Sequence, residues 1–127
     1  MAVSTVAFAI AQNTNNVLSG VATVDINGGE TSQIPCGGRA LVRINAPALT
    51  NTKLTFNVVP YPGATARPLH DLSHAKFEIS AGTGDASFVI PYLSGCYSFS
   101  IVCESAQAAA RLFNVQCIGT SPSNSAT

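Results

Sequence analysis

The feature that most constrains the fold is a series of short segments in which apolar and polar residues alternate, each closed by Gly or Pro. The clearest covers residues 53–59, where Leu54, Phe56 and Val58 alternate with Lys53, Thr55 and Asn57 before Pro60. A repeat of two places alternate side chains on opposite faces of a β-strand. Short strands separated by frequent Gly and Pro turns are typical of an all-β sandwich.

The alternation predicts seven strands, over residues 17–26, 39–45, 53–59, 76–80, 88–92, 96–103 and 111–118. The expected fold is therefore all-β, a two-sheet antiparallel β-sandwich of the jelly-roll or immunoglobulin-like type. We expect an extended N-terminal arm over residues 1–16, the sandwich over 17–118, and a short C-terminal tail over 119–127 that is rich in Ser, Pro, Asn and Thr. Residues 104–110 look helical but are too few for a stable isolated helix, so they are expected to connect two strands.

The same alternation assigns side chains to the two faces of these strands. In residues 39–45, Arg39 and Arg43 are expected outside the core. In residues 96–103, Tyr97 and Phe99 are expected to point inward, and Ser98 and Ser100 outward. In the last strand, either Leu112 or Phe113 is expected to anchor the inner face.

Charge is scarce in this chain. Only 9% of the 127 residues are Asp, Glu, Lys or Arg, where roughly a quarter is usual for a soluble domain. The formal net charge is zero, so no electrostatic field favours nucleic acid or an anionic membrane. A surface of Ser, Thr, Asn and Gln can be buried against another protein without the desolvation cost of charges. The composition thus predicts a domain that packs against neighbours, with neither a nucleic-acid nor a membrane partner.

The four cysteines, Cys36, Cys96, Cys103 and Cys117, lack the spacings typical of a zinc site. Cys96 and Cys103 share one expected strand and would lie too far apart for a disulfide bond. Cys96 and Cys117 could face each other across strands, but buried free thiols are the preferred interpretation and fit a reducing cytosol.

Residues that often carry catalysis or bind metals do not form a recognisable motif. His70 and His74 would share one face of a helix, with Asp71 between them, but Pro68 favours a loop and a third metal ligand is lacking. No serine lies in a Gly-x-Ser-x-Gly elbow, so a nucleophilic site built from Ser, His70 and Asp71 is not supported. We therefore predict no enzyme activity, no cofactor and no metal.

Carbohydrate binding is a stronger alternative. Exposed aromatic rings can stack on sugars, and Tyr61, Tyr92 and Tyr97 are available, although Trp is absent and Tyr97 is expected in the core.

The opening residues could also suggest a signal peptide. They lack a preceding Lys or Arg, and a β-prone arm is the preferred interpretation.

The chain resembles small β-sandwich proteins encoded among the structural genes of tailed bacteriophages and prophages. The matching segments, in order along the chain, are Arg39-Ala40-Leu41-Val42-Arg43-Ile44, Ala46-Pro47-Ala48, Leu54-Thr55-Phe56, Pro68-Leu69-His70-Asp71, Val89-Ile90-Pro91-Tyr92-Leu93-Ser94-Gly95 and Ser105-Ala106-Gln107-Ala108-Ala109-Ala110-Arg111. The step from Gln107 to Arg111 is the most specific of these. The chain departs from the group at residues 58–63, where a Ser-x-Asp-Gly turn is usual, and lacks the basic residues often found after Gly95.

This resemblance implies a virion protein, and the neutral surface favours a capsid decoration (cement) protein that binds the major capsid protein on the head surface. Such a protein would be made in the cytoplasm of the host bacterium. A glycan- or receptor-binding module of a head or tail fibre, and a neck or tail subunit, are the alternatives. Because capsid lattices contain three-fold positions, a homotrimer is the expected oligomer.

Two segments are expected to make the contacts. The N-terminal arm carries Val3, Val6, Phe8 and Ile10, which are expected to add a strand to another chain or to lie in one of its grooves. The tail is expected to lie along a neighbouring subunit. The long connection over residues 60–75 contains Tyr61, Arg67, His70, Asp71 and His74, and loops carry the function of many rigid sandwiches. Alternatively, Leu69 and Leu72 simply pin this loop over the end of the core.

Overall fold

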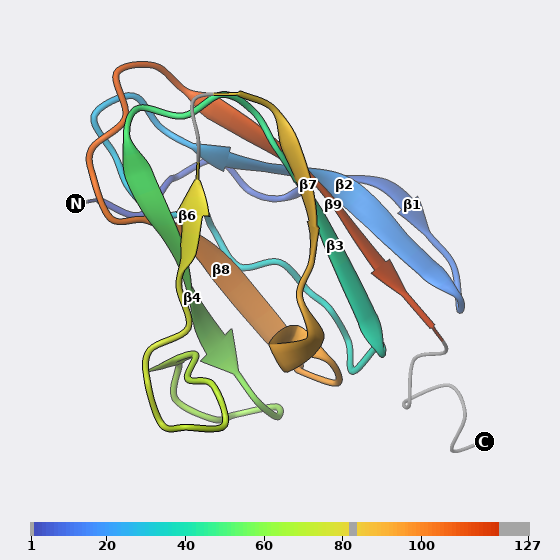
Figure 1. The fold of residues 1–127 in the computed structure, drawn as a ribbon. Coiled ribbons are helices and arrows are strands. Elements are labelled where there is room, and N and C mark those ends of the chain that lie inside the picture. The colour runs from blue at the N-terminus through green and yellow to red at the C-terminus, as the bar shows by residue number, and fades with distance from the viewer. Residues whose placement is uncertain (1, 82–83, 120–127) are drawn as a thin grey trace.

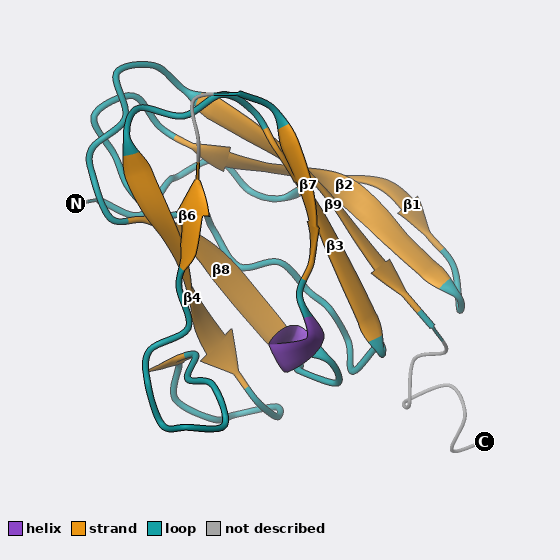
Figure 2. Cartoon of the chain, viewed as in Figure 1, coloured by secondary structure: helices purple, strands orange, loops and turns teal. Residues whose placement is uncertain are grey.

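A computed structural model describes residues 2–81 and 84–119. Within this part, the chain forms two antiparallel β-sheets that pack face to face, with one short 3-10 turn (Figure 2). The predicted all-β, two-sheet sandwich is confirmed. Residues 120–127 of the expected tail lie outside the described residues.

The first sheet has five strands in the order β1-β2-β9-β3-β7 (Figure 1). They are β1 (Ala9–Asn13), β2 (Val17–Val24), β3 (Leu41–Ala46), β7 (Ala86–Val89) and β9 (Arg111–Ile118). β9 is the central strand: Cys117 pairs with Leu18 of β2 on one side and with Val42 of β3 on the other. β1 and β7 are the two edge strands among the described residues.

The second sheet is built around β4 (Thr52–Val59). Its partners are β5 (Arg67–Pro68), β6 (Ile79–Ala81) and β8 (Ser98–Cys103). β8 pairs with β4 from Leu54 to Val59, while β5 and β6 pair with separate parts of it. β4 therefore joins β5, β6 and β8 into one sheet, and the long connection over residues 60–75 begins where β4 ends.

The core lies between the two sheets and follows the predicted alternation. In β4, Leu54 and Phe56 are buried, and in β9 the inner positions are Phe113, Val115 and Cys117. Phe113 is fully buried whereas Leu112 is exposed, which settles the inner face of the last strand. Phe56 and Phe99 meet edge to face across the second sheet, an arrangement that aromatic pairs favour.

The ends of several strands differ from the expectation. The strand expected over residues 76–80 begins later, as β6, Ile79–Ala81. Lys76 lies outside this strand, and its backbone forms an isolated β-bridge with His70. The strand expected over residues 88–92 is β7, Ala86–Val89, followed by the 3-10 turn η1, Pro91–Leu93. Proline has no backbone N–H to donate to a ladder, and it readily begins a helical turn, so the strand ends before Pro91.

The connection from β2 to β3 covers the free edge of β8. Backbone hydrogen bonds join Thr31 N to Ile101 O and Ile34 N to Phe99 O, at 2.9 and 2.7 Å. Ser98 and Ser100 point away from the core as predicted, but they are buried, not solvent-exposed as expected of outward residues. Ser100 Oγ donates to Glu30 Oε2 over 2.6 Å, so the polar side chains of this connection cover that face of the strand.

Residues 104–110 connect β8 to β9 without a helix, as predicted. Gln107 holds this connection in place. Its side-chain oxygen accepts from Thr50 N and Arg111 Nε, at 2.8 and 3.2 Å, and its nitrogen donates to Thr50 O and Ser105 O. Arg111 also donates to Thr50 Oγ1 over 2.7 Å. The Gln107 to Arg111 step is therefore a structural clamp between two loops.

Candidate functional site

The N-terminal arm packs along its own chain in this single-chain structure. Val3 forms a parallel bridge with Glu30, and β1 pairs with β2. Phe8 is half-buried against the core, while Val3, Val6 and Ile10 remain exposed on the surface. Contact of the arm with another chain stays a prediction, and these three exposed apolar side chains are the ones available for it.

The arm can lie this close because residue 20 is glycine. A Cβ at Gly20 would meet the backbone oxygen of Ala9 and would lie 2.7 Å from Phe8 Cζ. The side chain of Phe8 therefore occupies the space that any other residue at position 20 would fill.

The connection over residues 60–75 does not bring its five predicted site residues into one cluster. Tyr61 lies near β4, and Arg67 lies in the two-residue strand β5. His70, Asp71 and His74 lie together further along the connection. All three are in a turn, not a helix, which confirms the expected loop.

Asp71 organises that turn. Its Oδ1 accepts hydrogen bonds from Ser73 Oγ, Ser73 N and Ala75 N, at 2.7, 2.9 and 3.1 Å. These bonds, with that from Ser73 Oγ the largest cause, lower the pKa of the Asp71 carboxyl below its ordinary value. The rings of His70 and His74 stack with their centroids 5.3 Å apart. The polar groups of this turn thus bond mainly to one another.

The two leucines of the same connection, Leu69 and Leu72, differ in how far they are buried. Leu69 packs against the core, as the pinning alternative requires, but Leu72 is 93% exposed. Leu72 therefore does not pin the loop. It stands at the surface as a large apolar side chain.

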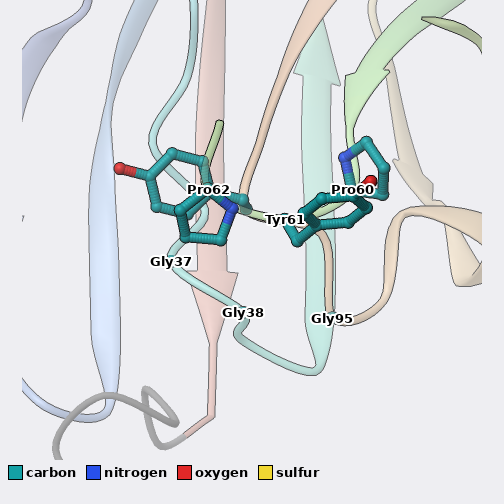
Figure 3. A pocket seen from close by; sticks show the side chains of 7 residues that line it. Gly37, Gly38, Pro60, Tyr61, Pro62 and Gly95 are labelled. Atoms are coloured by element: carbon teal, nitrogen blue, oxygen red, sulfur yellow. The ribbon is translucent and has the colours of Figure 1, made fainter. Parts of the chain in front are cut away.

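A pocket of about 260 Å³ opens at the end of the sandwich (Figure 3). Three connections line it with Gly37, Gly38, Pro60, Tyr61, Pro62, Gly95 and Tyr97. We call this the tyrosine pocket. The expectation that Tyr97 belongs to the core is wrong: it precedes β8, is 46% exposed, and lines the pocket together with the exposed Tyr61. Residue identity alone could not show this, because the strand begins at Ser98, two residues later than the alternation suggested.

Three of the residues that line the pocket are glycines. Gly37, Gly38 and Gly95 have φ angles of 66°, 78° and 79°, which residues with a Cβ rarely adopt. Gly37 N and Gly38 N donate to Tyr97 O and Cys96 O, both over 2.8 Å. These bonds tie two of the three connections together.

Two buried cysteines adjoin these glycines in the sequence, and a third is buried on β9. Cys36 precedes Gly37, Cys96 follows Gly95, and Cys117 lies on the inner face of β9. Hydrogen bonds from the thiols of Cys117 and Cys96, in that order, lower the pKa of Cys36 to about 4. The same interactions with Cys36 and burial raise the pKa of Cys96 and Cys117. All four cysteines are free and buried, as the preferred interpretation expected.

Arg39 was expected on the surface but is buried, with 6% of its side chain exposed. It donates from Nη1 to Cys36 O and from Nη2 to Thr14 O, at 3.1 and 2.7 Å, and its Nε has no hydrogen-bond partner. Both ion pairs among the described residues, Lys53–Glu78 and Lys76–Glu104, involve other cations. Alternation could not reveal this position, because Arg39 precedes β3 and its side chain turns back across the loop.

Among the described residues, no three or more His, Cys, Asp or Glu side chains are grouped so that they could bind a metal ion. Within residues 2–81 and 84–119 there is also no helix with the length and apolar character needed to cross a membrane.

No family model matches the chain, and no curated protein matches it. Among solved structures it is similar to the cupin domain of Schizosaccharomyces pombe Cnp3, with 16% identity and a TM-score of 0.44 over 94% of this chain. The chain spans 64% of that structure. A cupin domain from Bordetella pertussis is 11% identical with a TM-score of 0.44, covering 90% of this chain and 93% of the other.

A subunit from a structure described as Bacillus endospore appendages, a family of disulfide-linked pili, is 12% identical with a TM-score of 0.41. It covers 87% of this chain and 95% of the other. None of these three structures is a phage protein, so the resemblance seen in the sequence stays a prediction. At such identities and TM-scores, these likenesses carry no inference about function.

Proposed function

We propose that this protein is a structural assembly protein that docks the loop end of its sandwich on another protein. The observation that carries the proposal is the tyrosine pocket, an open and largely apolar hollow between Tyr61, Tyr97 and two prolines. Tyrosine is among the residue types that most often anchor protein interfaces. The lining contains no charged residue, so a partner can cover it without desolvating an ion.

Within this class, we propose a capsid decoration protein that binds the major capsid protein of a tailed phage. The sequence resemblance and the neutral surface support this choice. Bound at many junctions of the shell, such a domain stabilises the closed capsid because it binds that state alone. A homotrimer would match the three-fold positions of the lattice.

Binding of purified protein to capsids stripped of it tests the docking surface. Replacing both Tyr61 and Arg67 with Ala should weaken binding at least about tenfold, since interface anchors of these types often contribute more than about 1.4 kcal/mol each. Both side chains are exposed, so the melting temperature should stay nearly unchanged. Unchanged binding, or loss of folding, would contradict the role of this surface.

The matched control is Leu72→Ala, which removes a highly exposed apolar side chain from the same connection but outside the pocket. It should bind as the wild-type protein does.

Copy number tests the location separately: quantitative densitometry of purified virions should find hundreds of copies. About a dozen or fewer would instead indicate a neck or tail subunit.

Glycan binding is the second candidate function, and the exposed rings of Tyr61 and Tyr97 at one pocket favour it. A sugar stacks on the face of the tyrosine ring, and this contact does not require the phenolic hydroxyl group. Tyr61→Phe should therefore keep glycan binding and Tyr61→Ala should abolish it, as measured on a panel of bacterial surface polysaccharides. Binding to stripped capsids with no affinity for any glycan would exclude this alternative.

A further inference from the structure

We propose, on the basis of the homotrimer in the proposed function, that copies of this chain contact one another through the outer face of the five-stranded sheet. The outer face consists of the side chains of that sheet that point away from the core (Figure 1). On the central strand β9 these are Leu112, Asn114 and Gln116, which are exposed and alternate with buried residues. The contact would turn this face of each copy toward the three-fold axis.

The strand register aligns the outward side chains in rows across the sheet. Asn114 of β9 pairs with Val21 of β2 and with Asn45 of β3, and Asn45 pairs in turn with Ser87 of β7. Residues directly opposite each other in antiparallel strands point to the same side of a sheet, so these four form one row. Asn114 and Ser87 are exposed, and Val21 and Asn45 are half-buried. No described segment therefore covers this row.

Charge is almost absent from this face. The five strands contain no acidic residue and two basic ones, Arg43 and Arg111. Arg111 is held in the clamp with Gln107, and Arg43 Nη1 donates to Ser87 Oγ over 3.0 Å, toward the edge strand β7. Both ion pairs among the described residues involve the second sheet or residues that flank its strands. Depletion of charge is the compositional feature that distinguishes the centre of an interface from other surface.

The chemistry of the outer face matches a second copy of itself. Asn45, Asn114 and Gln116 carry carboxamide groups, each of which both donates and accepts hydrogen bonds. Identical faces can therefore bond to each other without any complementary charge. These three residues line an open hollow of about 320 Å³, which leaves room for a side chain of the neighbouring copy. The exposed side chains of Leu112 and Val89 add apolar area.

The face is also large enough for a stable contact. β2 and β9 each contain eight residues and β3 contains six. With strands about 4.8 Å apart and a rise of about 3.3 Å per residue, the face measures about 24 Å by about 20 Å. Three such faces turned to one axis would bury about 1,500 Å², above the roughly 1,000 Å² that a specific interface needs. The tyrosine pocket, at the end of the sandwich, stays open for another partner.

Hydroxyl-radical footprinting of the wild-type protein tests the contact without any substitution. Mass spectrometry measures oxidation of Leu112 and of Leu72, two exposed leucines, at protein concentrations well below and well above the dissociation constant of the trimer. We expect Leu112 to lose most of its oxidation in the trimer, because the contact excludes water from it. Leu72 lies in the connection over residues 60–75 and should be oxidised equally at both concentrations.

Two matched variants test the same contact energetically. Leu112→Ala and Leu72→Ala remove the same exposed side chain from the outer face and from the connection, so both should keep the wild-type circular dichroism spectrum. Leu112→Ala should raise the dissociation constant of the trimer at least about tenfold, because each copy loses an apolar side chain from the contact. Leu72→Ala should leave it unchanged. Sedimentation equilibrium measures both, and a trimer no weaker in Leu112→Ala would overturn the proposal.

The contact between copies and the docking on the capsid can fail separately. A trimer in which Leu112 keeps its monomer oxidation would overturn the role of the outer face and leave the homotrimer and the tyrosine pocket in place. Protein that stays monomeric but binds capsids through Tyr61 and Arg67 would overturn the contact and the homotrimer, but not the docking. Protection of Leu112 only after stripped capsids are added would assign this face to the capsid protein and overturn the contact between copies.

Discussion

Gln107 shows how a single polar residue holds two connections of the sandwich together. Its side chain is fully buried, yet both its oxygen and its nitrogen make two hydrogen bonds each. Its backbone N and O bond to Gly28 O and Asn27 N. A buried polar group satisfied in this way stabilises the fold, because removing it leaves its partners without bonds in a place that water cannot reach.

Replacing Gln107 with Ala should lower the free energy of unfolding by about 2–3 kcal/mol, since Thr50 N and Thr50 O lose their partner. Chemical denaturation measures this change. The control is Gln116→Ala, an exposed glutamine on β9, which should change stability by about 0.5 kcal/mol or less. Similar losses in the two variants would contradict the clamp.

At the scale of elements, the edge strand β1 depends on a residue of its neighbour. β1 is exposed at all five positions, so few buried contacts hold it to β2. Because Gly20 has no side chain, Ala9 and the Phe8 ring lie close to its backbone. Phe8 can therefore pack against the core and hold the strand in place. Nearer its start the arm is held separately, by the Val3–Glu30 bridge and by hydrogen bonds from Ser4 N to Glu30 O and from Ser32 Oγ to Val6 O.

Gly20→Ala should detach β1, because the added methyl group collides with Ala9 O and the Phe8 ring. Hydrogen exchange should show faster amide exchange over residues 9–13, while the amides of β9 keep their protection. Gly84→Ala is the matched control, since a Cβ there meets no atom within 4 Å. Unchanged exchange in Gly20→Ala would show that the arm does not depend on this contact.

Over the whole molecule, charged residues are scarce, and this determines which interactions can hold it to a partner. The described residues form two ion pairs, both at the surface. Large apolar side chains that are exposed include Val3, Val6, Ile10, Ile26 and Leu112. Association through such a surface relies on apolar burial and neutral hydrogen bonds, which salt does not screen.

We therefore expect a homotrimer at micromolar concentration whose dissociation constant changes by less than about threefold between about 0.05 and about 0.5 M NaCl. Sedimentation equilibrium at the two salt concentrations measures this directly. A stable monomer would contradict the predicted oligomer. A dissociation constant that rises steeply with salt would show that the few charges carry the contact.

The alternation of apolar and polar residues was sufficient to predict the class of fold and most of its strands. Alternation with a period of two is a local property, and it correctly predicted the inner face of β4, whereas for β9 it left Leu112 and Phe113 as alternatives. The helical-looking residues 104–110 were also correctly assigned to a connection, because they are too few to form a stable helix.

In contrast, the residues that cover each strand and those that meet in the core could be identified only from the folded chain. Arg39 is buried, Tyr97 is exposed, and Gly38 N bonds to Cys96 O although 58 positions separate the two residues in the sequence. These placements depend on connections that fold back over strand ends. Contacts between residues far apart in the chain leave no periodic trace, so local patterns could not reveal the tyrosine pocket.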